Sequence, residues 1–572
     1  MERLGFSTGS GRRRHPRRAR SARSPGTDRL YAARKLEASA QVARRADRFE
    51  RARELLEAAI DLAGDADPAW TARAHTQLSR LLALTGDLEA SLQAARAAVG
   101  IAPDGASRSL ALARIAVSIC RIGDSAGALL AAREAMRESL HASDPETEGV
   151  ARMSLGYALR ASGLPAAAAN EFRVATALAE AAGDHEAQVA RLIDLADSLH
   201  LGGDGAGAVS AAGRAIAAAR RGRCALGMPR ATRAYFAFHL GQWQQASRDL
   251  DDGLRDEPEF PWLHLMRAQL LVGRGDLVGA SHHLRVAETS TRGPRAGGWD
   301  GPQEIAAELA LWRGMPDTAL DLVQQALATI DLPERSSAGR RLTMLGLRAA
   351  ADLRGRARGT LRSAPATADA LIDLMRRHAG SLRETGQAES GGAQLLADEA
   401  TAEAEYARAR NVAVPEQWLE AALRHEVLNH PWDAGYARYR HAEAVLVGGG
   451  AVAEAKASLA VSYRVAVRLR APMLRALVVS LASQGGVMLL ARRAWPPASI
   501  STPREPRGLT AREREVLSCL AEGWTNRRMA TALGISEKTV SVHIGNIKQK
   551  LGVEHRTEAA AVAIRLSLAE QH

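Results

Sequence analysis

The sequence predicts an all-α protein: an array of helical pairs followed by a small C-terminal domain of four helices. Hydrophobic residues make up 46% of the chain but aromatic residues only 4%, and alanine and leucine dominate. This composition is typical of closely packed helices and not of a sandwich or barrel. A chain of 572 residues also exceeds what one compact core usually holds, so several domains or a repeat array are expected.

Residues 1–29 are predicted to be a disordered basic tail. The first 26 residues hold eight arginines and one glutamate, so they carry +7 of the net charge of +12. Glycine, serine and proline separate these charges, and such a segment cannot bury a core. The tail could add non-specific DNA affinity. The alternatives are a passive tail or a misassigned start of the sequence. No apolar stretch follows the arginines, so a signal peptide is not expected.

Residues 30–330 contain eight repeated units. In each unit a turn residue is followed by a small residue five and twelve positions later, and the turn residues recur every 34 to 40 residues. Small residues seven apart lie on one face of a helix and let it pack closely on its neighbours. The units are Asp47 with Ala52 and Ala59, Gly86 with Ser91 and Ala98, Gly123 with Ala128 and Ala135, Gly163 with Ala168 and Ala175, Gly203 with Ala208 and Ala215, Gly241 with Ala246 and Gly253, Gly275 with Ala280 and Ala287, and Gly314 with Ala319 and Ala326. Each unit is therefore a pair of helices, and the array resembles tetratricopeptide repeats with a looser and longer period.

A repeat array of this kind usually presents a concave binding surface. We expect it to bind a protein or small-molecule effector. The alternative is an interaction scaffold that only spaces the C-terminal domain, which would then mainly dimerise. RNA recognition by the repeats is disfavoured, because such codes need a regular period and the spacing here drifts.

Residues 331–494 are predicted to form further helical pairs with loops between them. Gly450, followed by Ala455 and Ser462, repeats the pattern of the array once more. Residues 495–507 contain four prolines and are expected to be a semi-rigid linker.

Residues 508–572 begin with a helix-turn-helix pattern. Thr510 and Glu513, three residues apart, form a capping box that starts a first helix. A second short helix, about Asn526 to Leu533, ends at a glycine. Ser536 then caps a third helix that runs to about Leu551. Two short helices joined by a glycine-containing turn are the signature of a DNA-binding helix-turn-helix.

The third helix has two unlike faces. At about 100° per residue, Val540, Ile544, Ile547 and Leu551 form one buried stripe. The opposite face is small and polar, which suits the major groove, and the residues that we expect to face bases are Thr539, Ser541, Val542, Gly545 and Asn546. Basic residues surround this face, and those that we expect to contact phosphates are Arg527, Arg528, Lys538, Lys548 and Lys550.

The stretch LTAREREVLSCLAEGWTNRRMATALGISEKTVSVHIGNIKQKLGV, followed by RTEA, closely resembles the LuxR-type helix-turn-helix domain of bacterial transcription regulators. The resemblance implies that the third helix enters the major groove and that a fourth, Thr557 to Leu568, forms a dimer contact through Ala560 and Ile564. Two departures concern DNA contacts. Ser541 and Gly545 stand where some members carry lysine, and Arg528 stands where an acidic residue is common.

The residues from Pro431 onward look like the last helical pair before the DNA-binding domain of the large ATP-binding LuxR regulators. No counterpart of their N-terminal ATPase domain is expected in this sequence, since no phosphate-binding Gly-x-x-x-x-Gly-Lys-Ser/Thr occurs; either nucleotide switching has been lost or the start lies within a longer gene product. We therefore expect a sequence-specific transcription regulator that needs no nucleotide cofactor. The resemblance implies double-stranded DNA as a partner, a homodimer on DNA, and activation through RNA polymerase.

Catalytic, metal-binding and membrane functions are not expected from the sequence. His425 and His430 lie five residues apart, whereas a zinc-protease helix needs a spacing of four. Cys120, Cys224 and Cys519 are far apart and match no metal-binding spacing. No run of about eighteen apolar residues occurs, so no membrane span is expected. The sequence thus predicts a cytoplasmic protein that is not an enzyme.

Overall fold

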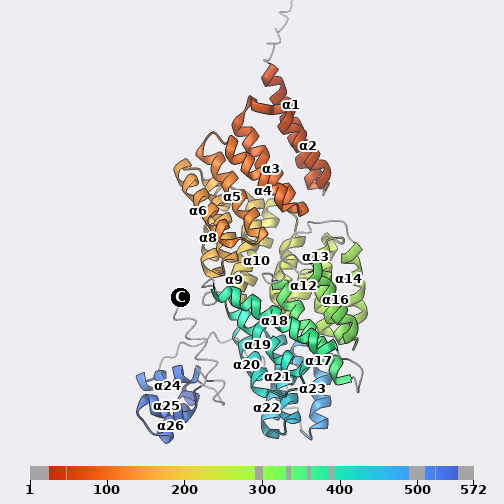
Figure 1. Ribbon diagram of the computed structural model, residues 1–572, viewed down its shortest axis with the longest axis vertical. Coiled ribbons are helices and arrows are strands. Elements are labelled where there is room, and N and C mark those ends of the chain that lie inside the picture. The colour runs from red at the N-terminus through yellow and green to blue at the C-terminus, as the bar shows by residue number, and fades with distance from the viewer. Residues whose placement is uncertain are drawn as a thin grey trace, which may run out of the picture.

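The computed structural model describes residues 25–46, 48–289, 301–329, 337–356, 363–384, 392–487, 509–521, 524–551 and 559. Helices are the only regular secondary structure in these ranges, which confirms the all-α class. Figure 1 shows the helices stacked one after another, with α1 at one end of the array. None of the helices described is both long enough and apolar enough to span a membrane.

Residues 25 to 329 form sixteen helices and one 3-10 turn (Gly64–Ala66) in the described ranges. The helices are α1 (Pro25–Arg45), α2 (Phe49–Ala63), α3 (Pro68–Thr85), α4 (Leu88–Ile101), α5 (Gly105–Ile122), α6 (Ser125–Ala142), α7 (Pro145–Ala161), α8 (Pro165–Ala181), α9 (His185–Leu201), α10 (Gly205–Gly222), α11 (Gly227–His239), α12 (Trp243–Asp256), α13 (Pro261–Arg274), α14 (Leu277–Thr289), α15 (Pro302–Trp312) and α16 (Pro316–Thr329). They pack as successive pairs, so each of the eight predicted units is one pair.

Seven more helices continue the array. They are α17 (Ser337–Arg356), α18 (Ser363–Glu384), α19 (Gly392–Ala409), α20 (Pro415–Val427), α21 (Pro431–Val447), α22 (Val452–Leu469) and α23 (Pro472–Gln484). The proline linker that we expect over 495–507 lies outside the described residues.

The small residues of the predicted pattern are buried throughout the eight units. The residues at plus five, from Ala52 to Ala319, are at most 1% exposed, and those at plus twelve are buried as well. Ser91, the one serine among them, lies between two other buried serines, with its Oγ 3.1 Å from that of Ser79 and 2.9 Å from that of Ser118. Close helix packing therefore explains why these positions stay small.

The turns between the paired helices also follow the pattern. The seven turn glycines from Gly86 to Gly314 have positive φ, a conformation that glycine adopts without strain. In four units the next residue is an aspartate whose carboxylate accepts a hydrogen bond from the backbone N–H three residues on: Asp87, Asp124, Asp204 and Asp276. Asp47, the predicted turn residue of the first unit, lies outside the described residues.

The prediction for the unit at Gly450 is wrong by one residue. Gly449, not Gly450, has the positive φ of +69°. Its N–H bonds the carbonyl of Leu446, and the N–H of Gly450 bonds that of Val445, as at the end of the earlier units. The connection carries one extra residue before α22, so Ala455 and Ser462 are nevertheless fully buried.

The later helices of the array fold back onto its middle. One hydrophobic core contains buried residues from Ala231 to Trp312 together with residues from Ala404 to Val487. At the contact, the ring of Trp432 lies 5.5 Å from that of Trp243 and 5.7 Å from that of Trp312. The turns at Gly203, Gly241 and Gly275 lie against successive parts of the segment from α19 to α23. This closing contact brings α11 and α21 together although they are far apart in the sequence.

The C-terminal residues form α24 (Ala511–Ala521), α25 (Asn526–Leu533) and α26 (Glu537–Leu551) around a core of their own. Val540, Ile544 and Ile547 are buried in this core, which confirms the predicted stripe for these three residues, while Leu551 packs against the core half-buried. Of the predicted fourth helix, only Ala559 is described, and it is fully buried. The predicted dimer residues Ala560 and Ile564 lie outside the described residues.

Candidate nucleic-acid interface and a polar cavity in the array

Local hydrogen bonds set the ends of the C-terminal helices. At the start of α24, the backbone N–H of Thr510 donates to Glu513 Oε2 (2.8 Å), and that of Glu513 donates to Thr510 Oγ1 (3.2 Å). This is the predicted capping box. Gly534 ends α25 with a φ of +64°, and Ser536 Oγ accepts from the N–H of Thr539 (3.1 Å) to start α26. These caps fix the turn that presents α26.

One face of α26 is exposed to solvent and carries mostly small side chains. Ser541, Val542, Gly545 and Asn546 are exposed, and Val542 leaves 56% of its surface open. An added Cβ at Gly545 would meet no atom of the described residues within 4 Å, so the face is open at this position. Thr539 is only half-buried, at the beginning of the helix. A large exposed hydrophobe among small and amide side chains suits contact with base edges and thymine methyl groups.

A hydrogen bond between the two helices limits what Ser541 can do. Asn526 Nδ2 of α25 donates to Ser541 Oγ (3.1 Å), and the Ser541 hydroxyl donates to the carbonyl of Glu537 (3.0 Å). A hydroxyl has one proton and two lone pairs, so Ser541 keeps a single acceptor position for a base. The sequence analysis missed this bond, because residue spacing does not show which side chains meet across a turn.

The predicted phosphate contacts fall into two groups. Arg527 and Lys538 are exposed and Lys548 is half-buried, beside the exposed face of α26. Two others make contacts inside the domain. The guanidinium of Arg528 lies 4.2 Å from the ring centroid of Trp524, and Lys550 Nζ lies 2.7 Å from Glu513 Oε2. The sequence did not indicate either contact, and both orient the side chain toward the protein.

Glu513 is well suited to hold Lys550 in place. Only 4% of the Glu513 side chain is exposed, and its carboxylate accepts from Lys550 at 3.0 and 2.7 Å. The Lys550 ammonium, followed by the N–H of Thr510, lowers the pKa of Glu513 from its ordinary 4.5. This carboxylate therefore stabilises the fold above pH 4.5, and the contribution is lost as the pH falls through the lowered value.

We expect Lys550→Met to lower the stability of the domain by about 1 kcal/mol, because it leaves a buried carboxylate without its cation. Hydrogen exchange of peptides from α24 and α26, measured in the full chain, reports this change. Lys538→Met is the matched control on the exposed side and should leave exchange unchanged. On DNA, Lys538→Met should instead weaken binding evenly across sequences and reduce the salt slope by about 1. Equal effects of both variants on exchange would contradict a structural role for Lys550.

Comparison with known proteins agrees with this geometry. Residues 507–563 match the family model of bacterial regulatory proteins, luxR family. The chain is 48% identical over 58 residues to the spore germination protein GerE of Bacillus subtilis and covers 78% of it. The chain belongs to the luxR family.

A second relative is longer than the matched region. Over 60 residues the chain is 53% identical to the probable transcriptional regulatory protein SgaR of Hyphomicrobium methylovorum. The match covers 10% of this chain and 28% of that protein. For the array, a tetratricopeptide repeat protein from Parabacteroides merdae is similar at 16% identity and a TM-score of 0.35, covering 48% of this chain and 98% of that one.

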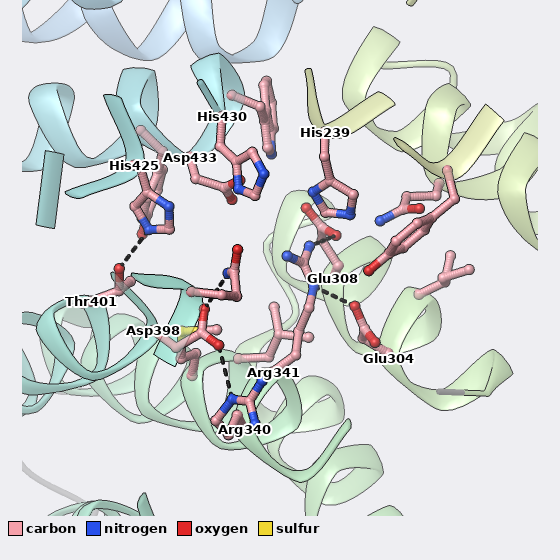
Figure 2. Close-up of a pocket in the computed structure, with 18 of the residues that line it drawn as sticks. His239, Glu304, Glu308, Arg340, Arg341, Asp398, Thr401, His425, His430 and Asp433 are labelled. Carbon is pink, nitrogen blue, oxygen red and sulfur yellow. Dashed lines mark hydrogen bonds and ion pairs between the residues drawn. The ribbon is translucent and has the colours of Figure 1, made fainter. Parts of the chain in front are cut away.

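The array of this luxR-family protein contains a partly open cavity of about 380 Å³, lined by both polar and apolar side chains. The cavity is lined by side chains from nine helices of the described residues: α7, α9, α11, α13, α15, α17, α19, α20 and α21. Figure 2 shows some of these side chains. Four arginines and six carboxylates are among them, so the lining has a formal charge of −2. The sequence analysis named no residue of this cavity as a site, because the closing contact assembles it from helices that are distant in the chain.

Several of these charges are paired at the cavity wall. Arg341 forms ion pairs with Glu304 and, at 3.2 Å, with Glu308. Arg340 Nε lies 3.0 Å from Asp398. Burial raises the pKa of Glu304, and the charge of Arg341 opposes this shift. These pairs fix α15, α17 and α19 around the cavity.

Other polar atoms at the cavity have no hydrogen-bond partner within the described residues. Arg348 lies between two rings, 4.7 Å from the centroid of Trp312 and 4.6 Å from that of Tyr436. Within the described residues, six buried polar atoms of the lining lack a hydrogen bond: Gln269 Oε1, Trp312 Nε1, Arg341 Nε, Arg348 Nε, Gln394 Oε1 and His425 Nδ1; of these, Arg341 Nε makes an ion pair with Glu304. Buried polar atoms are nearly always satisfied in folded proteins, so the cavity is suited to a polar ligand that supplies these bonds.

The pair His425 and His430, set aside in the sequence analysis, is part of this cavity. The two residues do not share a helix, because α20 ends at Val427 and α21 begins at Pro431. Their rings are stacked, with centroids 6.4 Å apart, and His425 Nε2 lies 2.9 Å from Thr401 Oγ1. Helical spacing therefore was not the relevant test for these histidines.

Proposed function

We propose that this protein is a sequence-specific transcription regulator whose helical array binds a polar effector and controls DNA binding. The exposed face of α26 carries the first part of the proposal, since it belongs to a luxR-family domain and is left open by the part of that domain that the structure describes. Thr539, Ser541, Val542, Gly545 and Asn546 read bases, while Arg527, Lys538 and Lys548 contact phosphates. A DNA target places this activity in the cytoplasm of a bacterium.

The cavity supports the second part of the proposal. Its volume of about 380 Å³ suits a small molecule, and a polar ligand would supply hydrogen bonds to its unpartnered polar atoms. Arg348, held between two aromatic rings, is placed to bind an anionic group of the effector. Effector binding would bias the closing contact, because α11 and α21 both line the cavity.

On DNA, the protein acts as a homodimer that binds two half-sites about one helical turn apart. It activates transcription through contact with RNA polymerase. The family membership of the C-terminal domain supports both statements.

Selection of binding sequences from a random duplex library tests the proposal. The full chain and the fragment 499–572 are used in parallel, followed by a salt titration on the selected sequence. We expect one shared inverted-repeat sequence with a steep salt slope, and a difference in affinity between the two proteins. Equal affinities would contradict control by the array. If neither protein selects a sequence, the C-terminal domain is a dimerisation module and the array a scaffold.

A further inference from the structure

Two histidine side chains from different parts of the array come close together in the cavity, beside Asp433. A ring nitrogen of His239, a ring nitrogen of His430 and a carboxylate oxygen of Asp433 all lie within 4.8 Å of one another. The rings of His239 and His430 have centroids 5.3 Å apart, and His200 stacks on His430 at 5.6 Å. Figure 2 shows His239 on one side of the cavity and His430 with Asp433 on the other (Figure 2).

The closing contact of the array creates this cluster. His239 is the last residue of α11, while His430 precedes α21 and Asp433 lies in its first turn. His239 is 8% exposed and His430 is 3% exposed, so both side chains are held by the surrounding helices. The backbone at Asn429 has a positive φ of 57°, which sets the direction in which the chain enters α21.

The three side chains have the chemical form of metal ligands. Imidazole nitrogens and carboxylate oxygens are the usual nitrogen and oxygen ligands of Zn²⁺ in proteins. Within the described residues, no hydrogen bond engages the ring nitrogens of His239 or His430 or the carboxylate of Asp433.

We propose that His239, His430 and Asp433 bind a divalent transition-metal ion of the Zn²⁺ class in this cavity. Ligand atoms around Zn²⁺ lie about 3.4 Å apart in tetrahedral geometry, so small side-chain rotations complete the site. Two nitrogen donors favour Zn²⁺ or Co²⁺ over Mg²⁺ and Ca²⁺, which prefer oxygen. Three protein ligands leave a position open toward the cavity.

The charges around the site accept a dication. Arg341 is the cation whose charge acts on both histidines, and Glu304 and Glu308 pair with it. This inference concerns the array alone and holds whether or not the C-terminal domain reads a DNA sequence.

Titration calorimetry of the full chain, stripped with a chelator and dialysed, tests the site without DNA. We expect one Zn²⁺ bound per chain, Co²⁺ binding with a visible absorption band, and no binding of Mg²⁺ or Ca²⁺ at the same concentrations. His239→Gln and His430→Gln should weaken Zn²⁺ binding by about 100-fold or more, since even outer-shell changes cost 10- to 100-fold. His283→Gln, outside the cavity, is the matched control and should bind Zn²⁺ as the unaltered chain does.

Two results would overturn the site: a stripped chain that binds neither Zn²⁺ nor Co²⁺, or unchanged binding in the His239→Gln, His430→Gln double variant. Circular dichroism checks that each variant is folded. If the histidine variants do not fold, Asp433→Asn decides the matter, because it keeps the shape of the side chain and removes the ligand charge. Full Zn²⁺ affinity in folded Asp433→Asn would then rule out the proposed ligand set.

Discussion

Replacing Gly241 with alanine is expected to destabilise the array by about 2 to 5 kcal/mol and to loosen its closing contact. Gly241 has a φ of +69°, and a non-glycine residue in this left-handed conformation costs about 1–2 kcal/mol. The added Cβ would also lie 2.5 Å from Pro431 Cγ and 3.0 Å from Leu469 Cδ2. Forcing a methyl group into such a contact costs a further 1–3 kcal/mol or so.

Gly86→Ala is the matched control for this change. Gly86 occupies the same turn position with a φ of +94°, but nothing lies within 4 Å of its added Cβ. It should therefore show the backbone cost alone. Urea unfolding followed by tryptophan fluorescence compares the two variants, because Trp243 and Trp432 meet at the closing contact. Equal destabilisation by both changes would mean that the contact with Pro431 adds nothing.

Asn546→Ala and Val542→Ala are each expected to remove about 1 to 3 kcal/mol of discrimination between the selected DNA sequence and its single-base variants. Both side chains are exposed on α26, away from the core that holds the domain together, so the fold should stay intact. An amide can bond an adenine edge, and a valine can contact a thymine methyl. Affinity for unrelated DNA should change little, because phosphate contacts remain.

Gln549→Ala on the same helix is the control for this experiment, since Gln549 is exposed but outside the expected base-facing set. Binding of each variant to the selected duplex and to a panel of single-base changes gives the discrimination at every position. If Gln549→Ala relaxes discrimination while Asn546→Ala and Val542→Ala do not, α26 is docked on DNA by another face.

Much of the local structure could be predicted from the sequence. Positive φ at Gly123 or Gly275 follows from the need to end a helix sharply, and burial of Ala128 or Ala280 follows from their place on the packed face. The bounds of α25, the caps of α26 and its buried stripe were predicted for the same reason. All these features depend on residues within about one or two helical turns of one another.

The sequence by itself thus determined the helical class, the eight repeated pairs and the domain that places the chain in the luxR family. Only the tertiary structure decided that Lys550 pairs with Glu513, that Asn526 bonds Ser541, and that His239 meets His430 across a cavity. Small rotations between successive units accumulate along an array, so where it closes depends on every packing angle before that point. No local sequence pattern predicts this accumulated rotation. For this reason the cavity and its histidines can be identified only from the tertiary structure.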